Sequence, residues 1–141
     1  MSENFITHDE AESLARVIQV VRRLTETSRP EVQRLTGFSR TLVSKYIETT
    51  IGLGLLEEGT LGVSSGGRAP RLLKFNADAG AILIAELGAR GMSIALSDLS
   101  GKLTEITEID GDIGLGPEKV LLKIESVFEK IIAKTKKEIW G

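Results

Sequence analysis

Thr36–Ile51 reads T-G-F-S-R-T-L-V-S-K-Y-I-E-T-T-I, which predicts a tight turn followed by about three turns of helix. Gly37 can supply the left-handed residue of the turn, and Ser39 stands where a helix N-cap is expected. At about 100° per residue, one arc of the helix is suited to pack on a core. This arc comprises Leu42, Val43, Tyr46, Ile47 and Thr50. The opposite arc comprises Arg40, Thr41, Ser44, Lys45 and Glu48.

The second arc carries short hydroxyl side chains between two cations, with one acid near its far end. Such a face is typical of a recognition helix whose N-terminal half lies against base edges in the DNA major groove. An ordinary solvent-exposed face with two cations gives the same pattern and is the commoner case. The neighbouring sequence therefore has to decide between the two interpretations.

Two more helices are predicted before this one. A capping box that begins at Thr7 precedes apolar residues at helical spacing, which indicates a helix from about His8 to Thr25. A second capping box begins at Ser28 and predicts a short helix, with Val32 and Leu35 facing inward. Three helices with a tight turn before the last favour a DNA-binding helix-turn-helix over a plain helical bundle.

The residues after the third helix predict a two-stranded wing. Leu55 begins one apolar run, and Leu72–Phe75 forms another. Thr60–Arg71 lies between them, is rich in Gly and Ser, and carries Arg68 and Arg71. Such a loop can follow the DNA backbone or enter a minor groove, where arginine is attracted by the negative potential. A plain hairpin loop without a DNA contact is the alternative.

These motifs together resemble the winged-helix head of ROK-family transcriptional regulators. The resemblance is carried by Ser28–Glu31, Leu35–Ser44, Gly52–Gly59 and, most specifically, by Gly66–Asn76, which reads G-G-R-A-P-R-L-L-K-F-N. It implies a head that binds operator DNA as part of a dimer or tetramer. It also implies a C-terminal body that resembles a sugar kinase of the actin/hexokinase type and senses a sugar.

The fold class expected on this basis is α+β. Residues 1–76 are expected to form a winged helix-turn-helix, and residues 77–141 the N-terminal part of a ribonuclease H-like α/β sensor domain. Asn76–Gly80 is a polar, Gly-ended joint and marks the boundary. The chain ends on apolar residues, and the resemblance puts the next buried strand there, so a fragment of a longer protein is expected.

The second half predicts strands followed by a helix. Residues 81–87 and 92–96 are apolar runs joined by a Gly turn and predict a buried hairpin. Residues 102–109 have a helix-like three-residue spacing, but the resemblance implies a third strand. A last helix after Pro117 is expected to pack on this sheet with one apolar stripe. The stripe comprises Val120, Leu121, Ile124, Val127, Phe128, Ile131 and Ile132.

Glu86 stands where the kinase-like fold has the Asp of its first phosphate-binding turn. The extra methylene of Glu displaces the carboxylate by about 1.5 Å, which disfavours octahedral Mg²⁺ coordination. A strand-end acid that is hydrogen-bonded to a neighbouring loop is the preferred interpretation of Glu86. We therefore expect no catalytic residue, no metal site and no cofactor in this stretch, and no enzyme activity.

Composition limits the function classes further. The chain of 141 residues has a net charge of −2, but residues 28–74 carry seven basic and four acidic residues, a local charge of +3. A local basic region on an acidic chain is compatible with DNA contact. The sequence has no cysteine, which excludes disulfides, and it shows no apolar run long enough to cross a membrane. A cytoplasmic protein without a signal peptide or membrane partner is expected.

The sequence thus predicts a transcriptional regulator of sugar-metabolism genes, with repression as the expected mode. Its predicted DNA-binding residues are Ser39, Arg40, Thr41, Ser44, Lys45, Arg68 and Arg71. Expected partners are double-stranded operator DNA, a sugar effector bound by the C-terminal body, and a second copy of the chain, because operators with two-fold symmetry require a dimer. The alternatives are a ROK-type sugar kinase with an accessory domain and a winged helix that binds protein.

Overall fold

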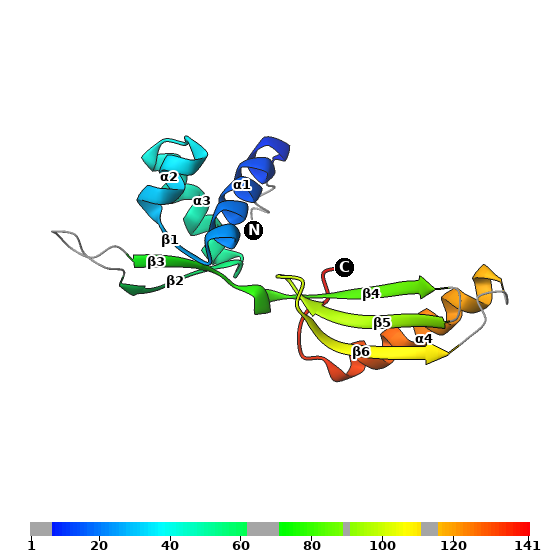
Figure 1. Ribbon diagram of the computed structural model, residues 1–141. Helices are drawn as coiled ribbons and strands as arrows, with labels where there is room; N and C mark the ends of the chain where they lie inside the picture. Colours follow the sequence, from blue (N-terminus) through cyan, green and yellow to red (C-terminus); the bar gives the residue numbers. More distant parts are fainter. Residues whose placement is uncertain (1–6, 62–70, 89–90, 111–115) are drawn as a thin grey trace, which may run out of the picture. The chain divides into compact units, whose positions relative to one another are not determined.

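A computed structural model describes residues 7–61, 71–88, 91–110 and 116–141. The chain divides into two compact units, Met1–Asn76 and Ala77–Gly141. Each unit combines helices with a three-stranded antiparallel sheet, in agreement with the expected α+β class (Figure 1). No helix in the described ranges is long and apolar enough to cross a membrane.

The first unit is a winged helix-turn-helix. Its elements are α1 (His8–Leu24), β1 (Glu26–Ser28), α2 (Arg29–Thr36), α3 (Arg40–Gly52), β2 (Leu56–Leu61) and β3 (Arg71–Phe75). The sheet has the order β1-β3-β2, so β3 is its central strand. Strand β1 was not predicted from the sequence, and it pairs Glu26–Ser28 with Leu72–Lys74. It ties the start of α2 to the wing.

The helix starts follow the predicted caps only in part. The Thr7 hydroxyl accepts a hydrogen bond from the Glu10 N–H at 3.3 Å, as its capping box requires. Ser28 precedes α2 but makes no side-chain cap hydrogen bond, so the predicted capping box there is wrong. The backbone of Ser28 is instead part of strand β1. Gly37 has φ 73°, which confirms the left-handed turn between α2 and α3.

One apolar core lies under the three helices and the sheet of this unit. Its buried residues are Leu14, Val17, Val21, Val32, Val43, Tyr46, Ile47, Leu56 and Leu73. Leu35 and Leu42 were predicted to face inward, but each is 40% exposed. Thr36 is buried in place of Leu35, and its hydroxyl donates to the Val32 carbonyl at 2.7 Å. That hydrogen bond satisfies a polar group that burial would otherwise destabilise.

The second unit is a three-stranded meander with one helix. Its elements are η1 (Ala77–Ala79), β4 (Ala81–Gly88), β5 (Gly91–Asp98), β6 (Leu103–Asp110) and α4 (Pro117–Lys134). Strand β5 is central and pairs antiparallel with both neighbours. The ambiguous residues 102–109 thus form a strand, as the family resemblance implied. Figure 1 shows α4 lying along the sheet, where it packs on β5.

The core of this unit contains fewer residues than the sequence predicted. Val120, Ile124 and Ile131 of α4 are buried, whereas Leu121 and Ile132 are 57% and 47% exposed. The buried stripe of α4 is therefore narrower than the predicted apolar stripe and does not include Leu121 or Ile132. The predicted hairpin is also only half buried, because most of β5 is buried while the second half of β4 is exposed.

The last residues return to the sheet. Ala81 and Ile139 form a parallel bridge, and the Leu83 N–H donates to the Gly141 carbonyl at 2.6 Å. The Trp140 ring lies over Gly80, where an added Cβ would come within 2.9 Å of it. Only glycine fits beneath this ring without a displacement. The contact fixes residues 138–141 beside β4.

Candidate nucleic-acid interface

Helix α3 is held by its apolar arc and exposes its polar arc. Ser39 caps it, with its Oγ accepting from the Leu42 N–H at 3.3 Å. Val43 and Ile47 are 2% and 0% exposed. Thr50 is also fully buried, and its hydroxyl donates to the backbone carbonyls of the preceding turn, which satisfies it without a partner outside the helix. The helix therefore has one fixed orientation on the core.

The predicted DNA-binding residues of α3 lie on the opposite side. Arg40 and Thr41 are exposed, and Ser44 is half-buried. Within the described residues, none of these three side chains makes a hydrogen bond or an ion pair. Their polar groups are available for a ligand. The helix N-terminus behind Ser39 adds backbone N–H groups that favour an anion.

Lys45 has a partner that the sequence did not indicate. Its Nζ lies 2.6 Å from a carboxylate oxygen of Glu10 in α1, and the Lys45 side chain remains 59% exposed. The Glu10 carboxylate raises the pKa of Lys45 above its ordinary value, chiefly through this hydrogen bond. The charge of Lys45 is thus shared with a protein carboxylate, whereas no carboxylate in the described part of the chain pairs with Arg40.

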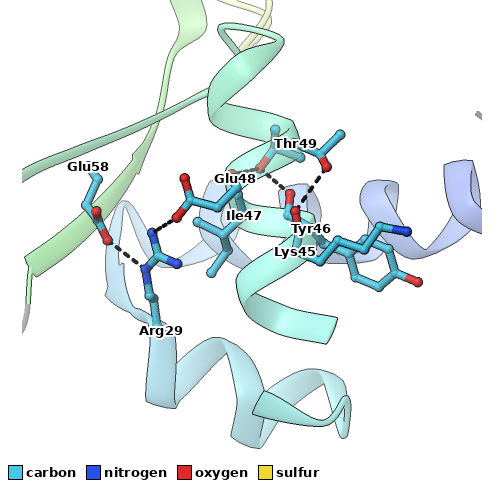
Figure 2. A network of polar contacts seen from close by, with 8 residues as sticks. Arg29, Lys45, Tyr46, Ile47, Glu48, Thr49 and Glu58 are labelled. Carbon is cyan, nitrogen blue, oxygen red and sulfur yellow. Dashed lines mark hydrogen bonds and ion pairs between the residues drawn. The ribbon is translucent and has the colours of Figure 1, made fainter. Parts of the chain in front are cut away.

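Arg29 connects three elements behind the polar arc (Figure 2). Its guanidinium, at the start of α2, donates to Glu48 of α3 at 2.6 Å and to Glu58 of β2 at 2.8 Å. The hydrogen bond to Glu58 is the main reason why the pKa of Arg29 is raised, and the same bond lowers the pKa of Glu58. Glu48, the one acid on the polar arc, therefore shares the charge of Arg29 with Glu58.

The wing is described only at its base. Arg71 begins β3 and is exposed, and its contact with DNA stays a prediction. Arg68 was predicted to contact the minor groove and lies outside the described residues. DNA contact by both arginines of the wing stays a prediction.

A groove of about 480 Å³ separates α2 from α3. It is lined by Arg29, Pro30, Gln33, Arg40, Val43 and Ser44. Gln33 was not among the predicted contacts, because its place beside Arg40 depends on how α2 crosses α3. The groove joins the outer residues of both helices into one polar surface.

Glu86 lies on β4 opposite Ser93 of β5 and is exposed. It borders an open polar hollow of about 480 Å³ with Glu108 and Asp110. Ser93 donates to Glu108 at 2.7 Å. Among the described residues, no group of three or more His, Cys, Asp or Glu side chains is arranged to hold a metal ion. The loop bond expected for Glu86 is not seen within these residues.

Comparison with known proteins finds relatives of this chain among curated repressors. No family model matches the chain. The chain is 32% identical to a xylose repressor of Caldicellulosiruptor bescii over 107 residues, which are 76% of this chain and 27% of that protein. It is 36% identical to a xylose repressor of Bacillus spizizenii over 76 residues, 54% of this chain and 20% of that protein. The chain thus spans about a quarter of the length of the curated relatives that it matches.

A solved structure has the same fold. The crystal structure of a ROK family transcriptional regulator, described as a homolog of the E. coli MLC protein, superposes with a TM-score of 0.72. The match covers 94% of this chain and 34% of that one, at 23% identity. Its coverage includes both units, so the winged helix and the first part of the hexokinase-like fold are both accounted for. Together, the matches show that the chain is similar to xylose repressors in sequence and to a ROK family transcriptional regulator in fold.

Proposed function

We propose that this chain contains the operator-binding head of a transcriptional repressor of sugar-metabolism genes. The observation that carries the proposal is the division of α3 into two arcs. One arc is buried, and the other presents Arg40, Thr41 and Ser44 without a protein partner within the described residues. Helices with this division enter the DNA major groove with their N-terminal residues against base edges.

The remaining predicted contacts have the following roles in this proposal. Ser39 presents the helix N-terminus to a phosphate, and Lys45 reaches the DNA backbone after leaving Glu10. Arg68 and Arg71 act from the wing. The protein is proposed to be cytoplasmic and to bind as a homodimer, because one short helix reads too few base pairs for tight binding.

The effector is proposed to be a sugar bound by a C-terminal body that this stretch only begins. The relatives' names make xylose the first sugar to test. The relatives are named repressors, which supports a regulator rather than an enzyme.

The test is footprinting on the region upstream of the protein's own operon, with and without xylose. We expect protection of a two-fold symmetric site. We also expect an affinity that falls steeply from low to physiological salt, because bound phosphates release condensed counterions. Weak association with every duplex at all salt concentrations would reject DNA binding and favour a protein-binding winged helix.

A further inference from the structure

The groove between α2 and α3 contains one polar side chain, that of Gln33, which the interface described so far does not use. Gln33 projects from α2 and lines the groove with Arg40 and Ser44 of α3. Within the described part of the chain, the side chains of these three residues make no hydrogen bond or ion pair. All three can donate hydrogen bonds, and one of them is a cation. Such a set is suited to a ligand with several acceptor oxygens and a negative charge.

The electrostatics of the groove differ between its two ends. At one end, the single positive charge of Arg29 faces two carboxylates, Glu48 and Glu58, which leaves an excess of negative charge. At the other end, no carboxylate among the described residues is paired with Arg40. An anion is therefore attracted to the Arg40 end and repelled from the Arg29 end. Gln33 and Ser44 line the groove together with Arg40.

We propose that this groove seats one phosphodiester of the operator backbone, with Gln33 as a DNA contact in addition to those of α3. The inference rests on the proposed function. Gln, Ser and Arg side chains are common phosphate partners in protein–DNA interfaces. The helix before a recognition helix crosses the DNA backbone in helix-turn-helix complexes, which brings a residue such as Gln33 to a phosphate.

A phosphate contact carries no sequence information, and this property makes the proposal testable on defined DNA. The experiment measures binding of the full chain to a mixed-sequence duplex and to the footprinted operator, over a series of salt concentrations. The variants are Gln33→Ala, Gln33→Glu and Arg40→Gln. Gln19→Glu on the exposed side of α1 changes the net charge equally and is the control.

Gln33→Ala is expected to weaken binding about two- to tenfold on both duplexes, with an unchanged salt dependence, because a neutral hydrogen bond is lost. Gln33→Glu is expected to weaken binding at least about tenfold, since its carboxylate would face the phosphate. Arg40→Gln is expected to reduce the slope of log K against log salt by about 0.9, the value for one phosphate. Thermal unfolding followed by circular dichroism verifies that each variant remains folded.

The outcomes separate this inference from the function on which it rests. If Gln33→Glu binds as tightly as Gln19→Glu while the wild type still shows salt-dependent binding, the groove does not seat a phosphate and the proposed function stands. If Gln33→Ala weakens binding to the operator but not to the mixed duplex, Gln33 reads a base edge and the phosphate assignment is wrong. If the wild type itself lacks salt-dependent binding, the proposed function fails.

Discussion

Lys45 Nζ lies 2.6 Å from Glu10 Oε1, so a cation on the exposed polar arc of α3 is bound by a carboxylate of α1. A phosphate that binds Lys45 has to displace Glu10. Exposed ion pairs are weak, so the competition is modest but measurable.

Glu10→Gln is therefore expected to tighten DNA binding about 1.5- to fivefold, because Lys45 no longer has to leave a carboxylate. Glu12→Gln makes the same change of charge on α1 and should tighten binding less. In a Lys45→Met background, Glu10→Gln should have no more effect than Glu12→Gln. A full effect of Glu10→Gln without Lys45 would show that general electrostatics, and not this ion pair, sets the affinity.

Val43→Asp is expected to unfold the first unit. Val43 is 2% exposed, and an aspartate there would be buried without a partner, at a cost of about 3 kcal/mol or more. Thr41→Asp places the same carboxylate on the exposed arc of the same helix. Both variants should lose DNA binding, but only Val43→Asp should lose its cooperative thermal transition. A native-like melting curve for Val43→Asp would contradict the orientation of α3.

Glu58→Gln is expected to reduce the stability of the first unit by about 1–2 kcal/mol at neutral pH, since Arg29 then loses a charged acceptor. The folded-state pKa of Glu58 lies below its ordinary value. Its stabilising effect is therefore complete above that ordinary value and is lost as the pH falls through the folded-state pKa.

The stability difference between wild type and Glu58→Gln should accordingly shrink towards acid pH. Urea unfolding at several pH values, followed by circular dichroism, measures it. Glu57→Gln on the same strand is exposed and serves as the control. A difference that does not depend on pH would mean that the Arg29–Glu58 pair is not charged in the folded state.

Gly80→Ala is expected to destabilise the second unit by about 1–3 kcal/mol, because the new methyl group overlaps the Trp140 ring. Trp140 is the only tryptophan, so its fluorescence reports this unit. Gly59→Ala has open space around the added carbon and should change stability little. The explanation requires Trp140→Leu to reduce the cost of Gly80→Ala, and circular dichroism measures that double variant.

Sequence periodicity found the buried arc of α3 but not its edges. Val43 and Ile47, at its centre, are buried as predicted. Leu42 at the edge of the arc is exposed, as is Leu35 of α2. Periodicity gives the direction of a side chain and not the extent of the partner that covers it, so it did not predict this exposure. The residues at the centre of the buried arc of α3 could thus be predicted, but those at its edge could not.

Contacts between distant residues were beyond sequence reasoning. Arg29 meets Glu48 and Glu58 across 19 and 29 residues, and no local pattern encodes those distances. The three-residue strand β1 was missed for a similar reason, because its hydrogen bonds are supplied by β3. Local spacing also gave residues 102–109 a helical pattern, whereas pairing with β5 makes them a strand.

The separation of the two arcs of α3 has an evolutionary consequence. Residues that keep the helix in place, such as Val43 and Ile47, are different from those that face outward, such as Arg40 and Thr41. Exchanges at Arg40 and Thr41 break no side-chain hydrogen bond or ion pair among the described residues. Duplicated copies of such a gene can therefore diverge towards new target sites without a loss of thermal stability, and a designer can retarget the protein by the same substitutions.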